Sequence, residues 1–148
     1  MHFAGTVTIN APRDKVWRFL TDPRELTRCA PGLESIDVIT PNQKFRAVAS
    51  VGFGAVKATF TTDVEWTDLD APNRAAMKAH GKAPGSVVDA VSGMILSDGP
   101  DGATVLDWSS DVTIIGAIAS LAARLMGVVT QKVTDSFFEC VRKQIEEH

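Results

Sequence analysis

The chain has 148 residues, of which 45% are hydrophobic and 22% charged, and its formal net charge is −3. This length and composition are typical of a globular protein with one substantial core, so we expect residues 1–148 to form a single domain. The charged residues form no basic block, which argues against nucleic-acid binding.

The cysteines and histidines are too scattered to predict a metal site. Cys29 and Cys140 are far apart and belong to no CxxC pair, and His2, His80 and His148 form no cluster with them. We therefore expect no metal, no other cofactor and two free thiols, as in a reducing cytoplasm.

The sequence also predicts where the protein resides. Residues Met1 to Thr6 lack the basic segment and apolar core of a secretory signal, so we expect a cytoplasmic protein. The most apolar stretch, Val112 to Val129, contains Arg124 and several polar or small residues. We interpret it as a core helix with its entry strand and not as a membrane span.

Alternation of apolar and polar side chains predicts a series of strands. It is clearest from Val56 to Trp66, where one face is largely apolar and the other polar, as in a sheet with one wet face. Clusters of Pro, Gly, Asn and Asp separate the segments as turns. The expected strands are Phe3–Asn10, Glu34–Thr40, Lys44–Val51, Val56–Trp66, Arg74–Lys82, Val87–Leu96 and Thr104–Val112, with Gly52-Phe53-Gly54 as a turn.

Helical spacing predicts two short helices after the first strand and one long helix at the C-terminus. We expect Asn10 to cap the first helix, with Pro12 in its first turn, and Pro23 to open the second. The long helix should cover Ile115 to Glu147. Its expected buried stripe is Ile118, Leu121, Leu125, Val128, Val129, Val133, Phe137, Val141 and Ile145.

This order of elements predicts an α+β fold in which a seven-stranded antiparallel sheet wraps around the long C-terminal helix. The long helix is the only element large enough to cover the apolar face of the sheet. A strongly curved sheet closed over one helix leaves space between them, which the two short helices would roof.

Large apolar side chains are expected to surround that space. Each of them could simply fill the core, but together they favour an apolar pocket. The predicted ligand-binding residues are Trp17, Leu20, Pro31, Phe53, Phe60, Trp66, Met77, Met94, Trp108, Leu121 and Leu125, with Ser110 as a hydrogen-bond donor.

No arrangement of residues predicts a catalytic centre. A nucleophile needs a neighbouring base, and Ser109 and Ser110 have no histidine in a recognisable context. Asp107 and Asp111 should point away from the face that carries Trp108. We therefore predict a binding protein and no enzyme. Two alternatives remain: a cofactorless cyclase or aromatase on the same scaffold, and a maturation or interaction factor without a ligand.

Six segments spread over the chain form a recognisable series: Ala11-Pro12 through Val16-Trp17, Asp22-Pro23, Cys29-Ala30-Pro31-Gly32, Val51 to Phe60, Ala123-Arg124-Leu125 and Phe137-Phe138. In this order they resemble the CoxG family of carbon monoxide dehydrogenase subunits, within the START-like (SRPBCC) helix-grip superfamily. The Cys-x-Pro-Gly and Val-Lys-Ala-Thr-Phe pieces are the more specific ones.

The resemblance implies an accessory protein that binds a quinone or lipid-like molecule and serves an aerobic, molybdenum-containing CO dehydrogenase or a related hydroxylase. Family members are linked to membrane association of that enzyme. Many carry a C-terminal apolar anchor, whereas this chain stops at Glu146-Glu147-His148. We therefore expect any contact with the inner face of the membrane to be transient and peripheral.

Overall fold

A computed structural model describes residues 1–53 and 55–146, and only the backbone of Phe53. Gly54 of the expected turn and Glu147 of the expected helix lie outside the described residues. The elements are β1 (His2–Ile9), α1 (Arg13–Thr21), α2 (Pro23–Leu26), β2 (Leu33–Thr40), β3 (Lys44–Phe53), β4 (Val56–Asp70), β5 (Arg74–Ala83), β6 (Ser86–Asp98), the 3-10 turn η1 (Pro100–Gly102), β7 (Thr104–Gly116) and α3 (Ala119–Glu146).

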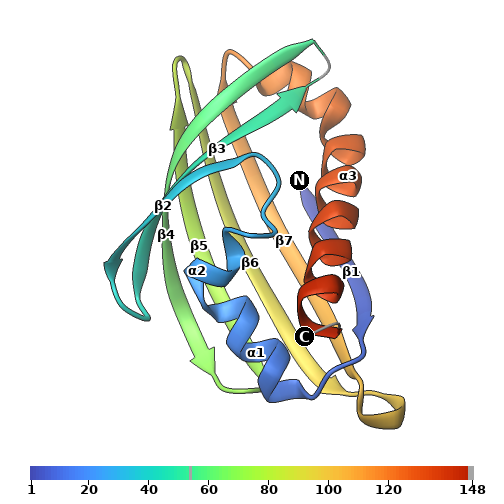
Figure 1. Ribbon diagram of the computed structural model, residues 1–148. Coiled ribbons are helices and arrows are strands. Elements are labelled where there is room, and N and C mark those ends of the chain that lie inside the picture. The colour runs from blue at the N-terminus through green and yellow to red at the C-terminus, as the bar shows by residue number, and fades with distance from the viewer. Residues whose placement is uncertain (54, 147–148) are drawn as a thin grey trace.

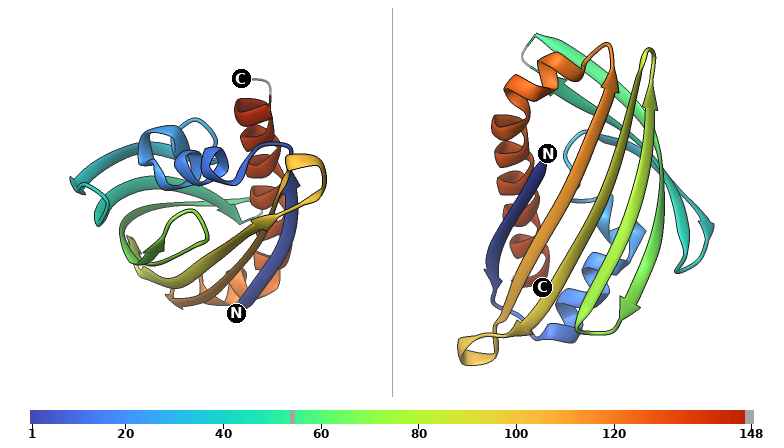
Figure 2. Two further views of the ribbon diagram at one scale, coloured as in Figure 1. Left: turned by 90° about the horizontal axis from the view of Figure 1, so that it is seen from below. Right: turned by 180° about the vertical axis from the view of Figure 1, so that it is seen from behind.

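All seven strands belong to one antiparallel sheet in the order β1-β7-β6-β5-β4-β3-β2. Strands β2 to β7 pair with their neighbours in sequence, and β1 pairs with β7 from His2↔Asp111 to Ile9↔Thr104. The sheet curves strongly, and α1, α2 and α3 all lie on its concave side (Figure 1; Figure 2). The predicted helix-grip fold is thus confirmed.

Strand β4 shows why the sheet has one apolar face. Ala58, Phe60 and Val64 are buried, while Thr59, Thr61 and Asp63 between them are exposed. Because successive side chains of a strand point to opposite faces, this alternation turns every second residue toward the helices.

Two clusters of buried side chains hold the helices on the sheet. In the larger one, Val16 of α1 packs with Leu106 of the sheet and with Val141 and Ile145 near the end of α3. In the smaller one, Phe60 packs beneath Ala122 in the first turns of α3. The long helix is therefore attached at both ends.

The boundary between β7 and α3 differs from the prediction. The strand extends to Gly116, and the helix begins at Ala119 and not at Ile115. Strand pairing continues because β6 is long enough to reach Ser86↔Gly116. Gly116 then turns the chain with φ +111°, and a Cβ on it would lie 2.1 Å from the Gly85 carbonyl oxygen.

The predicted cap by Asn10 is wrong. Helix α1 begins at Arg13, its N-cap position is Pro12, and no side chain caps it. The Asn10 N–H donates instead to the Glu146 carboxylate at 2.7 Å, and the Ala11 carbonyl accepts from the Thr104 hydroxyl at 2.8 Å. These two bonds hold the bend at Asn10 and Ala11 that leads into Pro12.

Two residues of the predicted buried stripe of α3 are exposed, Val128 by 59% and Val133 by 38%. Val128 is turned to solvent because it lies about 100° around the helix from Val129, which packs against the smaller cluster. Val133 faces the sheet side, but it lies over a cavity and not over packed side chains.

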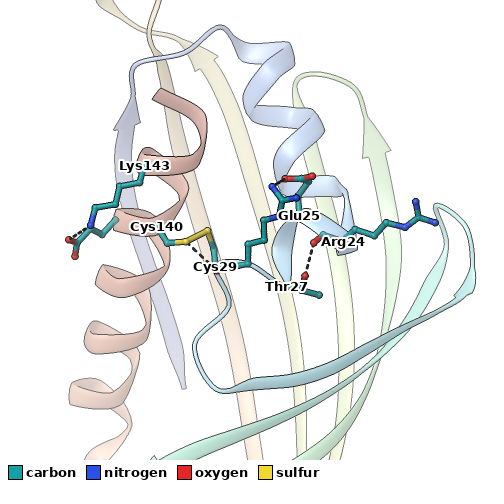
Figure 3. Close-up of a disulfide and its surroundings, with 8 residues drawn as sticks. Arg24, Glu25, Thr27, Cys29, Cys140 and Lys143 are labelled. Atoms are coloured by element: carbon teal, nitrogen blue, oxygen red, sulfur yellow. Dashed lines mark hydrogen bonds and ion pairs between the residues drawn. A yellow bond between two sulfur atoms is a disulfide. The ribbon is translucent and has the colours of Figure 1, made fainter. Parts of the chain in front are cut away.

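The expectation of two free thiols is also wrong, because Cys29 and Cys140 form a disulfide with a Cα–Cα distance of 5.4 Å. The two residues are 111 positions apart, so no local pattern could indicate the bond. Figure 3 shows Cys29 in the loop after α2 facing Cys140 on α3.

Within the described residues, no helix combines the length and apolar character that crossing a membrane requires.

The contrast between buried and exposed valines of α3 can be tested with matched substitutions. Val141 is fully buried and Val128 is 59% exposed, so the same change has different consequences on one helix. Val141→Ala should lower the free energy of unfolding by about 2 kcal/mol, through lost burial and a residual cavity. Val128→Ala should change it by less than about 0.5 kcal/mol. Equal losses in urea unfolding would contradict this packing.

Candidate functional site

A cavity of about 380 Å³ lies between the concave face of the sheet and the helices. The sheet provides its floor, α1 and the segment from α2 to β2 cover one side, and α3 covers the other. Its principal lining residues are Leu20, Leu26, Ala30, Leu33, Phe45, Trp66, Met77, Ser92, Met94, Leu106, Trp108, Ser110, Val133, Thr134, Phe137 and Phe138. This size falls within the range of sites for small organic ligands.

Strand register places the floor side chains in rows. Trp66 of β4 pairs with Met77 of β5, and Met94 of β6 pairs with Trp108 of β7. Side chains that oppose each other on one face of an antiparallel sheet are neighbours, so an indole and a thioether meet in each pair. The floor is therefore broad and apolar.

One polar spot interrupts this floor. Ser92 and Ser110 pair directly across β6 and β7, and their hydroxyl oxygens are 2.7 Å apart. One hydroxyl donates to the other, and the accepting hydroxyl keeps its own proton for another acceptor. The pair can thus offer one O–H donor to a ligand oxygen.

No ionisable side chain occurs among the described residues that line the cavity. The side chains with a shifted pKa are exposed and lie outside the cavity. The Arg46 guanidinium donates to Asp63 at 2.8 Å, which lowers the pKa of the Asp63 carboxyl. The hydrogen bond from Arg74 to Asp68 raises the pKa of Arg74. The described part of the chain also contains no group of His, Cys, Asp or Glu that could hold a metal ion. The cavity can thus bind a ligand through its shape, apolar contacts and the hydroxyl groups among its lining residues.

Comparison with known families identifies the type of protein. The family model for CoxG, described as a subunit of carbon monoxide dehydrogenase, matches residues 5–146. The chain belongs to the CoxG family. No curated protein matches it significantly.

Solved structures share the fold over nearly the whole chain. A conserved protein from Geobacillus kaustophilus has 25% identity and a TM-score of 0.91, with 99% of this chain and 96% of that chain covered. The Zhui aromatase/cyclase from Streptomyces sp. R1128 has 19% identity and a TM-score of 0.76, covering 99% and 93%. A START superfamily protein from Mycobacterium smegmatis has 10% identity and a TM-score of 0.71, covering 99% and 97%. The last two show the fold alone.

The residues predicted to bind a ligand fall into three groups. The cavity is lined by Leu20, Trp66, Met77, Met94, Trp108 and Ser110. Phe60 lines a second, smaller cavity of about 180 Å³, and Leu121 and Leu125 pack in the cluster that contains it. Trp17 is buried in the larger core cluster, Pro31 is exposed, and the side chain of Phe53 lies outside the described residues.

Several lining residues were not among the predicted ones. Ser92 belongs to a Ser-Gly pair that interrupts the apolar pattern of β6, but counting back by two from Met94 places it on the inner face. Phe137 and Phe138 form an edge-to-face pair with ring centroids 5.1 Å apart, and both line the cavity. Their contact with the cavity could be inferred only from the position of α3 over the sheet.

Gly5 permits the position of Trp108. These residues pair across β1 and β7, and a Cβ on Gly5 would lie 2.8 Å from the indole Nε1. A larger residue at position 5 would therefore displace the indole that forms part of the cavity floor.

Because of this close approach, substitution by alanine should affect stability differently at Gly5 and at Gly93. Gly5→Ala should lower the free energy of unfolding by about 1–3 kcal/mol, as overpacking does, and should change the near-UV circular dichroism of tryptophan. Gly93→Ala is the matched control, because its nearest contact would be an ordinary 3.6 Å. It should leave stability equal or higher. Tolerance of both substitutions would contradict the contact.

Proposed function

We propose that the protein binds a hydrophobic small molecule, a quinone or a lipid-like compound, in the cavity of about 380 Å³ and releases it chemically unchanged. The observation that carries this proposal is an apolar cavity whose floor contains the hydrogen-bonded pair of Ser92 and Ser110. Apolar walls favour a hydrophobic ligand, and a few placed polar groups fix its orientation.

A quinone ring matches this arrangement. Flat rings pack well against the indoles of Trp66 and Trp108, which line the floor. A quinone carbonyl can accept the hydroxyl proton that the Ser92–Ser110 pair leaves available. A lipid with a carbonyl or hydroxyl group would use the same donor.

Two alternatives are less well supported. A cyclase or aromatase that uses general acid–base catalysis needs an ionisable group within hydrogen-bond reach of its substrate, and the described lining residues provide none. A maturation factor that binds no ligand would need no cavity of this size. The cavity therefore supports ligand binding over both.

The description of the family suggests the partner. We propose that the protein serves a CO dehydrogenase-type molybdenum hydroxylase as a ligand-binding accessory protein. We place it in the cytoplasm, where it would contact the inner face of the membrane peripherally.

One end of the molecule has the character that such a contact requires. The turns β3–β4 and β5–β6 and the β7–α3 connection lie at the same end of the sheet (Figure 1). Residues 55–58, 82–87 and 113–124, which we call the basic end, contain Lys57, Lys82 and Arg124 and no carboxylate, in a chain with 18 acidic residues. Val56 and Ile115 are exposed there by 45% and 63%. Exposed apolar side chains among cations suit an anionic lipid surface.

The ligand proposal is tested with two compounds that share one carbon skeleton, 2,3-dimethyl-1,4-naphthoquinone and 2,3-dimethylnaphthalene, of which only the first has carbonyl oxygens. Replacing both cavity serines, Ser92→Ala with Ser110→Ala, should weaken quinone binding roughly three- to tenfold, the worth of one hydrogen bond, and leave hydrocarbon binding unchanged. Calorimetric titration of the delipidated protein measures both affinities.

The control is Ser97→Ala, an exposed serine of β6 outside the cavity lining, which should change neither affinity. If neither compound binds the unmodified protein, the proposed function is wrong. If the double variant and Ser97→Ala have the same quinone affinity, the Ser92–Ser110 hydroxyl pair is not the polar contact.

Membrane contact is tested by sedimentation with vesicles of phosphatidylglycerol and phosphatidylcholine. Binding should fall with added salt, because each cation near the surface contributes about 1 kcal/mol. Val56→Asp with Ile115→Asp should abolish it. Val91→Asp with Ile95→Asp changes two exposed residues of β6 outside the basic end and should preserve binding. Equal loss in both variants would contradict a contact through the basic end.

A further inference from the structure

The disulfide joins two parts of the cavity wall that are distant in sequence. Cys29 lies in residues 27–32, which we call the clasp loop, between α2 and β2. Leu26, Ala30 and Leu33, in and beside this loop, line the cavity. Cys140 lies on α3 less than one turn after Phe137, which lines the opposite side.

The disulfide links the clasp loop to α3 covalently, beside the apolar packing of Cys29 in the larger core cluster. Apart from the two cysteines, no ion pair or side-chain hydrogen bond joins the clasp loop to α3 among the described residues. Its side chains interact locally instead: Arg28 pairs with Glu25 at 3.3 Å, and the Thr27 hydroxyl donates to the Arg24 carbonyl at 2.6 Å (Figure 3). Breaking the disulfide would therefore remove the covalent connection across the cavity wall.

The helix, in contrast, has other attachments. Lys15 donates to the Ile145 carbonyl at 2.8 Å, and the Arg142 guanidinium donates to the Thr8 carbonyl at 3.2 Å. Val141 and Ile145 are buried in the larger cluster. On its other side, the clasp loop stays joined to β3, because the Ser50 N–H donates to the Gly32 carbonyl at 2.9 Å. Loss of the disulfide would thus free the loop while α3 and the sheet stay in place.

We propose that the Cys29–Cys140 disulfide is a redox-controlled clasp of the cavity, and that its reduction lets the clasp loop move away from α3 so that ligand enters and leaves faster. This rests on the proposed function for its ligand. Disulfides of cytoplasmic proteins are usually transient or redox-sensing, which fits a switch in that compartment.

The reduction is a two-electron exchange with a dithiol. A thiolate of the dithiol attacks Sγ of Cys140, which is partly exposed, and displaces the thiolate of Cys29, which is only 5% exposed. The second thiol of the reductant then attacks the mixed disulfide and becomes oxidised. The protein gains two electrons and two protons as two thiols, and the dithiol becomes a disulfide.

The test compares three forms of the full chain: disulfide-bonded, reduced with dithiothreitol and desalted without oxygen, and Cys29→Ser with Cys140→Ser. Release of the neutral fluorophore N-phenyl-1-naphthylamine is followed after dilution in a stopped-flow instrument. Release should be roughly tenfold faster or more from the reduced protein and the double variant, because opening of the loop then no longer limits it. Dithiothreitol should have no effect on the double variant.

Hydrogen exchange of the same three forms tests the clasp without any ligand. Exchange should accelerate at amides of residues 26–33 in the reduced and double-variant proteins and stay unchanged at residues 141–146 and in the sheet. Faster exchange over the whole chain would overturn the proposal, since the disulfide would then only stabilise the fold. Faster exchange of the loop with unchanged fluorophore release would also overturn it. If the fluorophore binds no form, the proposed function fails, and localised exchange still supports a clasp.

Discussion

The width of the sheet relative to the helix that covers it determines most of what is distinctive in this structure. Seven strands spaced about 4.8 Å apart span roughly 29 Å, whereas a helix with its side chains is about 10–12 Å across. Helix α3 therefore covers about a third of the apolar face. Curvature of the sheet brings more of that face against the helix, and α1 and α2 cover part of the remainder, but a space is left between them.

The lining of that space is almost entirely apolar because the strands that surround it are regular. Every second residue of β3 to β7 points inward, and these residues are apolar with few exceptions. The main exception is the pair of Ser92 and Ser110, whose hydroxyl groups hydrogen-bond to each other across two neighbouring strands. A fold of this kind can keep an apolar cavity open without burying an unpaired polar group among the described residues.

The fold class and most strands could be predicted from the sequence because each rests on a short repeating pattern. The alternation along β4 needs only its own residues, and so does the amphipathic spacing of α3. Boundaries were less accurate where distant partners decide them. Strand β7 runs to Gly116 because β6 continues beside it, and Asn10 caps no helix because α1 begins only at Arg13, after Pro12 at the N-cap position.

For the cavity, period-two counting on the strands brought Trp66, Met77, Met94, Trp108 and Ser110 to one face, where the structure finds them lining one space. The same counting said nothing of which end of the sheet that space occupies, so Phe60 was grouped with residues from which the structure separates it. Trp17 packs in the same core cluster as Trp66 and Trp108 but does not line the cavity. The register of a strand is a local property, whereas the position of a helix along the sheet is set by the packing of its whole buried face.

The sequence by itself determined the family, the helix-grip fold and the apolar inner face, since these follow from motifs and from periods of two and 3.6 residues. Only the tertiary structure decided where the cavity lies, that two serines meet in its floor, and that Cys29 and Cys140 are bonded. Each of these depends on contacts between segments far apart in the chain. Such contacts arise from how the curved sheet and its one long helix share the available apolar surface, and no local pattern encodes them.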